Sequence, residues 1–126
     1  NAFAEAYLRL FTAFRQEYTT SCALVHRETR ALARGLAAVD GLTVHPTDAN
    51  FVFCRLDPAV GSAPELVLRL LESEGIYVKD CSGKTMADAR QYLRISSRGE
   101  ADDRRLCRAL DRVIAAMRAA RPGAAL

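Results

Sequence analysis

The first third of this chain, residues 2 to about 38, has the periodicity of a helix that is too long for a small domain. Apolar residues recur at helical spacing near its start (Phe3, Tyr7, Leu10, Phe11, Phe14) and towards its end (Val25, Leu32, Ala33, Leu36). An unbroken helix of this length would extend for roughly 55 Å. Thr19, Thr20 and Ser21 have low helix propensity and hydroxyls that can cap a helix. We therefore expect a break between Phe14 and Thr20.

Four short strand patterns follow, at residues 42–45, 51–56, 76–79 and 92–96. A helix at 62–75 separates the second from the third. Its start is a capping box made by Ser62 and Glu65, and its end is Gly75. A last helix begins near Gly99 with an acidic first turn, and Pro122 and Gly123 begin a frayed tail. This order predicts an α/β chain of the α+β two-layer type, a small sheet of three or four strands covered by helices.

Composition narrows the function classes. The 126 residues fit one domain, and a net charge of +3 is too small to indicate nucleic-acid binding. No apolar run approaches the ~20 residues that cross a bilayer, so we expect no membrane segment. The four cysteines lack metal-ligand spacing, which favours reduced thiols, no metal site and a cytoplasmic location. The chain begins within a helical pattern and without methionine, so we expect a fragment.

Arg94 is the most informative single residue, because it lies inside the apolar run Tyr92-Leu93-Arg94-Ile95-Ser96. Alternation along a strand places Leu93 and Ile95 in the core and Arg94 on the other face. A guanidinium suits a carboxylate, which it can hold with two parallel hydrogen bonds. The alternative from spacing alone is a solvated arginine or a structural salt bridge.

Three segments together resemble one family. They are residues 46–53 (Pro-Thr-Asp-Ala-Asn-Phe-Val-Phe), 75–83 (Gly-Ile-Tyr-Val-Lys-Asp-Cys-Ser-Gly) and 92–96, followed by the acidic helix start. The set resembles the C-terminal small domain of fold-type I, pyridoxal-phosphate-dependent aminotransferases of class I/II. The similarity is to the histidinol-phosphate aminotransferase-like branch, which includes nucleotidyltransferase-fused aminotransferases and threonine-phosphate decarboxylases. It covers residues 1–126 in the right order.

The resemblance implies three substrate-binding residues. Arg94 matches the arginine that binds the substrate α-carboxylate. Lys79 stands where some members carry an arginine for the distal anion of the substrate, although a surface lysine is the alternative. Asn50 matches a motif residue whose amide lines the site, although an Asx-type turn is equally consistent with it.

The resemblance also implies what this chain lacks. The Schiff-base lysine and the other groups that bind pyridoxal phosphate belong to the large domain. We therefore expect that the chain alone holds no cofactor, has no catalytic residue and is inactive. The expected partners are an amino-acid or 2-oxo-acid substrate and the large domain, in a homodimeric parent. The face formed by Phe3, Tyr7, Leu10 and Phe14 is the expected contact with that large domain.

Several functions remain open. The first is the substrate-binding part of an aminotransferase, which moves an amino group from an amino acid to a 2-oxo acid. A decarboxylase uses the same carboxylate contact. The others are a stand-alone module that binds an amino acid or small anion, and a single-strand nucleic-acid binder with Phe51, Phe53 and Tyr92 as a stacking platform. The last is disfavoured because no basic stripe accompanies these aromatic residues.

Overall fold

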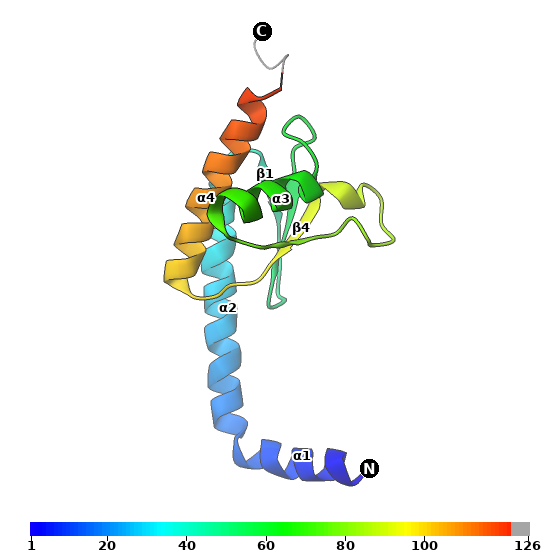
Figure 1. The fold of residues 1–126 in the computed structure, drawn as a ribbon. Coiled ribbons are helices and arrows are strands. Elements are labelled where there is room, and N and C mark those ends of the chain that lie inside the picture. Colours follow the sequence, from blue (N-terminus) through cyan, green and yellow to red (C-terminus); the bar gives the residue numbers. More distant parts are fainter. Residues whose placement is uncertain (122–126) are drawn as a thin grey trace.

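A computed structural model describes residues 1–121, and Pro122 and Gly123, the predicted tail, lie outside the described residues. The elements follow the predicted order (Figure 1). They are α1 (Ala2–Ala13), α2 (Arg15–Ala37), β1 (Leu42–His45), β2 (Val52–Leu56), α3 (Ala63–Glu74), β3 (Lys79–Asp80), the short 3₁₀ helix η1 (Ala89–Gln91), β4 (Tyr92–Ile95) and α4 (Glu100–Ala119).

The long helical region breaks at Phe14, within the predicted interval. Phe14 has φ −109° and ψ 22°, outside helical geometry, and its N–H still donates to the carbonyls of Leu10 and Phe11. Thr19 does not cap a helix as predicted, because its hydroxyl donates back to the Arg15 carbonyl at 2.9 Å within α2. Figure 1 shows α1 turning aside at the foot of α2, away from the rest of the molecule.

The sheet is antiparallel throughout, with strand order β1-β2-β4-β3. One face is buried against α2, α3 and α4. Its fully buried strand residues include Val52, Cys54 and Leu93, which pack with Leu36 and Leu110 in a single core. Among residues 1–121 no helix covers the opposite face, so the predicted two-layer α+β architecture is confirmed (Figure 1).

Local sequence signals fix the ends of α3. The Ser62 hydroxyl accepts a hydrogen bond from the Glu65 N–H at 3.4 Å, and Gly75 ends the helix in the left-handed conformation with φ +65°. The Ile76 N–H then donates to the Leu70 carbonyl. Because this donor is used in closing the helix, the predicted strand 76–79 is wrong at its start, and pairing begins only at Lys79.

The last helix matches its prediction. It begins at Glu100, and the predicted apolar positions are all buried: Leu106, Leu110, Val113, Ile114 and Met117. Glu74 at the end of α3 forms two hydrogen bonds with Arg112 of α4, at 2.8 and 3.1 Å. Of the helices in residues 1–121, none combines the length and apolar character that a membrane span needs.

Candidate functional site

Arg94 lies at the centre of β4 with its side chain on the open face of the sheet. Its neighbours Leu93 and Ile95 are 0% and 2% exposed, whereas Arg94 itself is exposed, which confirms the predicted alternation. Within residues 1–121 its guanidinium forms no ion pair with a carboxylate and has no hydrogen-bond acceptor. Of the two alternatives from sequence, a structural salt bridge therefore does not account for this side chain, whereas a solvated arginine agrees with its exposure.

Lys79 is the residue directly opposite Arg94 across the β3–β4 ladder. Its side chain is exposed and, in the part of the chain that the structure describes, it too lacks an ion-pair partner. Directly opposed residues of an antiparallel pair lie on one face with Cβ atoms about 5 Å apart. The two positive side chains therefore share one face of the sheet, and their charges make that part of the surface electropositive.

The carboxylate nearest to this pair in sequence is already engaged. Asp80 follows Lys79, and its Oδ1 accepts hydrogen bonds from the hydroxyl and the N–H of Ser82, the latter at 2.9 Å. These bonds, helped by the Lys79 charge, hold the pKa of Asp80 below its ordinary value. The same turn is tied to β4, because the Cys81 N–H donates to the Tyr92 carbonyl at 2.9 Å. Asp80 thus interacts mainly with Ser82, and within residues 1–121 it forms no ion pair with Lys79.

Phe51, the residue immediately before β2, contacts Arg94. The Arg94 Cζ lies 3.9 Å from the centroid of the Phe51 ring, a cation–π contact. The residue opposite Arg94 is Phe53, so Phe51 is its diagonal neighbour. An aromatic and a long side chain can meet across such a diagonal. This contact was not predicted from the sequence, because it depends on the register between β2 and β4.

Asn50 lies immediately before Phe51, in the turn between β1 and β2. Its side chain is exposed and has no hydrogen-bond partner among residues 1–121, so the Asx-type turn considered from sequence is not formed. Thr47 organises the turn instead. Its hydroxyl donates to the Phe51 carbonyl at 2.8 Å and accepts from the Ala49 N–H at 3.1 Å. The structure thus brings Lys79 and Arg94 together, with Asn50 next to the ring that Arg94 covers.

The remaining aromatic rings on this face pack on one another. Phe53 and Tyr92 are stacked, with centroids 4.8 Å apart and planes inclined by 8°, and His45 lies 5.6 and 5.8 Å from them. Arg94 covers Phe51. One face of each ring in the hypothetical nucleic-acid platform is therefore already covered.

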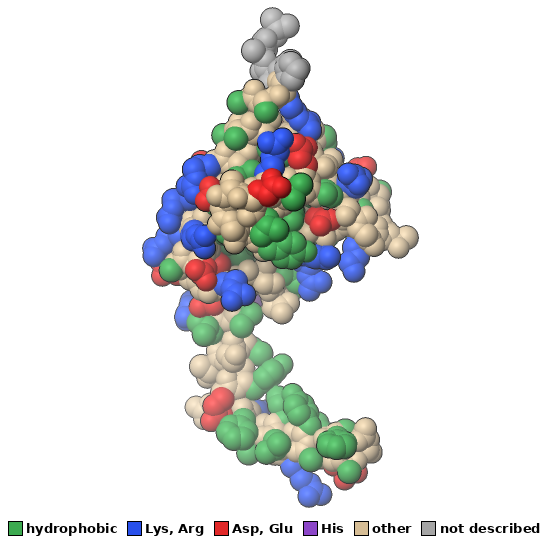
Figure 2. Space-filling model, in the orientation of Figure 1, with side chains coloured by type: hydrophobic (Ala, Val, Ile, Leu, Met, Phe, Trp, Pro, Cys, Tyr) green, Lys and Arg blue, Asp and Glu red, His purple; other side chains and the backbone are tan. Residues whose placement is uncertain are grey.

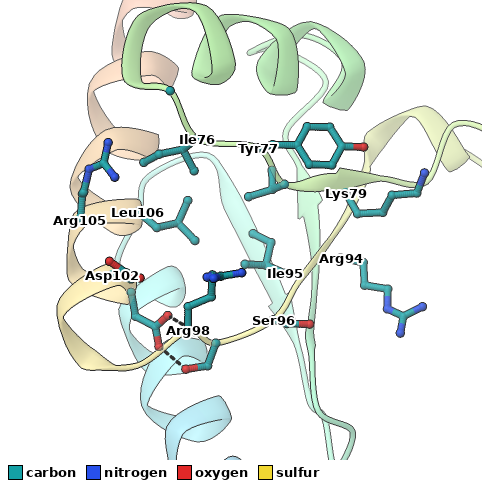
Figure 3. Close-up of a pocket in the computed structure, with 14 residues that line it drawn as sticks. Ile76, Tyr77, Lys79, Arg94, Ile95, Ser96, Arg98, Asp102, Arg105 and Leu106 are labelled. Carbon is teal, nitrogen blue, oxygen red and sulfur yellow. Dashed lines mark hydrogen bonds between the residues drawn. The ribbon is translucent and has the colours of Figure 1, made fainter.

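A groove of about 540 Å³ runs beside the two cations, between the β3–β4 edge and the start of α4. Figure 3 shows Arg94 and Lys79 on the side of this groove away from Asp102 and Arg105. Ile95 and Leu106 lie between them and supply apolar lining. Arg105 donates to the Glu74 carbonyl at 2.8 Å, so that guanidinium is partly engaged.

Comparison with known proteins decides the family. The family model described as aminotransferase class I and II matches residues 2–113. The chain belongs to this family. It is 42% identical over 120 residues to CMP-5'-(3-aminopropyl)phosphonate synthase of Streptomyces rubellomurinus. The aligned region covers 95% of this chain but 19% of that protein. The chain thus spans about a fifth of that relative.

Superposition on solved structures supports the same family assignment. The L-threonine-O-3-phosphate decarboxylase of Porphyromonas gingivalis superposes with a TM-score of 0.74 at 26% identity, over 91% of this chain and 34% of that one. The histidinol-phosphate aminotransferase of Clostridium acetobutylicum superposes with a TM-score of 0.63 at 26% identity. This superposition covers 71% of this chain and 26% of that one. The resemblance predicted from the three motifs is confirmed.

Dependence on pyridoxal phosphate is expected for this family, whose enzymes hold the cofactor through a lysine. Covalent attachment requires a lysine whose amine is desolvated. The sequence has two lysines. Lys79 is exposed on an edge strand, and Lys84 is exposed in the loop after β3. Neither setting fits the cofactor, so its attachment point is not provided by residues 1–121.

Proposed function

We propose that this chain is the small domain of a pyridoxal-phosphate-dependent enzyme, in which Arg94 binds the α-carboxylate of an amino-acid substrate. The observation that carries the proposal is a guanidinium on an open sheet face that has no carboxylate partner among residues 1–121. A carboxylate held by two hydrogen bonds fixes the orientation of the substrate Cα, which lowers the entropic part of the barrier.

Lys79 is proposed to bind a second anion of the substrate, and Asn50 to line the same site. An ammonium is a point charge that can serve a phosphate without the bidentate geometry that a carboxylate prefers. The names of all three compared proteins include a phosphate or phosphonate. We therefore assign the substrate class as an amino acid with a distal phosphate or phosphonate group.

The cofactor and a large domain are proposed to come from the rest of a longer protein, active as a homodimer in the cytoplasm. Support comes from α1, whose apolar residues are exposed: Phe3 89%, Tyr7 67%, Leu10 60% and Phe14 56%. Figure 2 shows hydrophobic side chains gathered over this helix. The occupant of this face is the large domain, since the chain spans 19% of the length of its Streptomyces relative.

The reaction we propose is amino transfer from the amino acid to a 2-oxo acid. Decarboxylation is the second candidate, because the superposition on the threonine-phosphate decarboxylase is the better of the two, with a TM-score of 0.74 against 0.63. Both reactions need the α-carboxylate to be held, so Arg94 has the same role in each.

The test uses the complete protein to which we propose this chain belongs, supplied with pyridoxal phosphate. A panel of phosphorylated amino acids is incubated with 2-oxoglutarate, and glutamate and carbon dioxide are both measured. Glutamate formation supports amino transfer, and carbon dioxide release without glutamate supports decarboxylation. Arg94→Ala is expected to lower kcat/KM in either case. Neither product, or turnover that Arg94→Ala leaves unchanged, contradicts the proposal and favours a stand-alone binding module.

A further inference from the structure

The direction of the Arg94 side chain depends on one aromatic ring. Within residues 1–121 no hydrogen bond or ion pair holds its guanidinium. The 3.9 Å contact between the Arg94 Cζ and the Phe51 ring is the specific interaction that the group makes there. A cation–π contact uses the face of the guanidinium and none of its five N–H donors. The donors thus stay available for a carboxylate.

Contacts on both sides of Phe51 in the chain hold its backbone in place. Its carbonyl accepts a hydrogen bond from the Thr47 hydroxyl at 2.8 Å, and the next residue, Val52, is 0% exposed and paired with Ile95 in the sheet. The turn also contacts α2, where Asp48 lies 3.5 Å from the Nε2 of His26. The backbone at Phe51 is therefore held in place, which limits where its ring can lie, whereas a free arginine side chain has many rotamers.

We infer that Phe51 is a positioning residue for the substrate carboxylate, acting through Arg94. This inference rests on the proposed function of Arg94. By restricting the guanidinium before substrate arrives, the ring lowers the entropy that binding must overcome. Removing it is expected to weaken carboxylate binding about 2- to 5-fold, the range for a cation–π contact at an exposed site.

The experiment compares two ligands that differ only in the carboxylate, O-phospho-L-threonine and 1-amino-2-propanol phosphate. Dissociation constants are measured by titration calorimetry in the complete protein without pyridoxal phosphate, so that neither ligand is converted during the titration. Phe51→Leu is expected to weaken binding of the first ligand by about 2- to 5-fold and to leave the second unchanged. Phe51→Tyr keeps the aromatic face and is expected to restore the wild-type value. A merely structural role would weaken both ligands together.

A double-mutant cycle isolates the coupling between the two residues. In an Arg94→Ala background, Phe51→Leu is expected to have no further effect on O-phospho-L-threonine. A persistent effect, or equal weakening of both ligands, would overturn the inference. If Arg94→Ala weakens binding of O-phospho-L-threonine but Phe51→Leu does not, the inference about Phe51 is overturned and the proposed function of Arg94 still holds. If Arg94→Ala itself changes neither dissociation constant, the proposed function and this inference both fail.

Discussion

Lys79 and Arg94 are direct partners across the β3–β4 ladder, two positive side chains on the same open face. Like charges placed opposite each other destabilise an antiparallel pair. In the described part of the chain neither has a carboxylate partner that would offset this cost. The pair is therefore more consistent with binding an anion than with stabilising the sheet.

This arrangement predicts that removing one charge stabilises the fold. Lys79→Gln is expected to raise the free energy of unfolding by about 0.2–0.5 kcal/mol at low salt, measured by urea denaturation. The gain is expected to shrink in high salt, because screening weakens the repulsion. Lys84→Gln, which changes the other lysine in an exposed loop, serves as the control and is expected to have no effect. A loss of stability in Lys79→Gln would contradict the repulsion.

Lys79 is also predicted to determine which ligands the protein prefers. In the complete protein, Lys79→Ala is expected to weaken binding of O-phospho-L-threonine by about 5-fold, the upper range for an exposed ion pair. Binding of L-threonine, which lacks the phosphate, is expected to be unchanged. The two dissociation constants are compared by calorimetry, and equal weakening of both ligands would show that Lys79 does not bind the distal anion.

The loop that follows Arg94 is predicted to depend on Asp103. This carboxylate is only 8% exposed and accepts hydrogen bonds from the Ser97 hydroxyl at 2.5 Å and the Arg98 N–H at 3.0 Å. Asp103→Ala is expected to lower the free energy of unfolding by about 2–3 kcal/mol, because two donors lose a charged acceptor. Asp102→Ala, an exposed carboxylate in the same turn, is the matched control, with a change expected within about 0.5 kcal/mol. Similar losses in the two variants would exclude this role.

Acid stability is predicted to involve the junction between α3 and α4. The hydrogen bonds from Arg112 hold the pKa of Glu74 below its ordinary value of 4.5. A lowered pKa in the folded state contributes stability above the ordinary pKa, and that contribution is lost as the pH falls through the shifted value.

The measurement is the difference in unfolding free energy between wild type and Glu74→Gln as a function of pH. It is expected to be largest above pH 4.5, the ordinary pKa of the group, and to shrink as the pH falls below that value. Glu72→Gln, an exposed neighbour on the same helix, is the control. A difference that grows on acidification would contradict the direction of the shift.

Much of this fold was predictable because its signals are local. The strand at Leu42–His45, the Ser62 cap, the Gly75 stop and the buried face of α4 follow from residues within a few positions of one another. The need for a break in the first helical region followed from its length, but the hydroxyl residues at 19–21 did not predict that the break lies at Phe14. The family was recognisable from three motifs in the right order.

What the sequence did not predict depends on contacts between distant residues. Strand 76–79 shortened to Lys79–Asp80 because the Ile76 N–H closes α3. Asp103 belongs to the acidic first turn that was expected for the last helix, but its acceptance of hydrogen bonds from the preceding loop was not expected. Phe51 was expected in the second strand, yet it lies just before β2 and supports Arg94. These roles follow from register and tertiary packing, which no single segment encodes.

The most direct test of the account is whether Arg94 binds a carboxylate. In the complete protein, Arg94→Ala is expected to raise the dissociation constant of O-phospho-L-threonine by about 10- to 100-fold, the loss of a charge-assisted hydrogen-bonded pair. The dissociation constant of 1-amino-2-propanol phosphate is expected to be unchanged. Arg55→Ala removes another arginine from the same sheet face and is expected to leave both constants unchanged. Equal effects of Arg94→Ala on the two ligands, or no effect on either, would contradict the account.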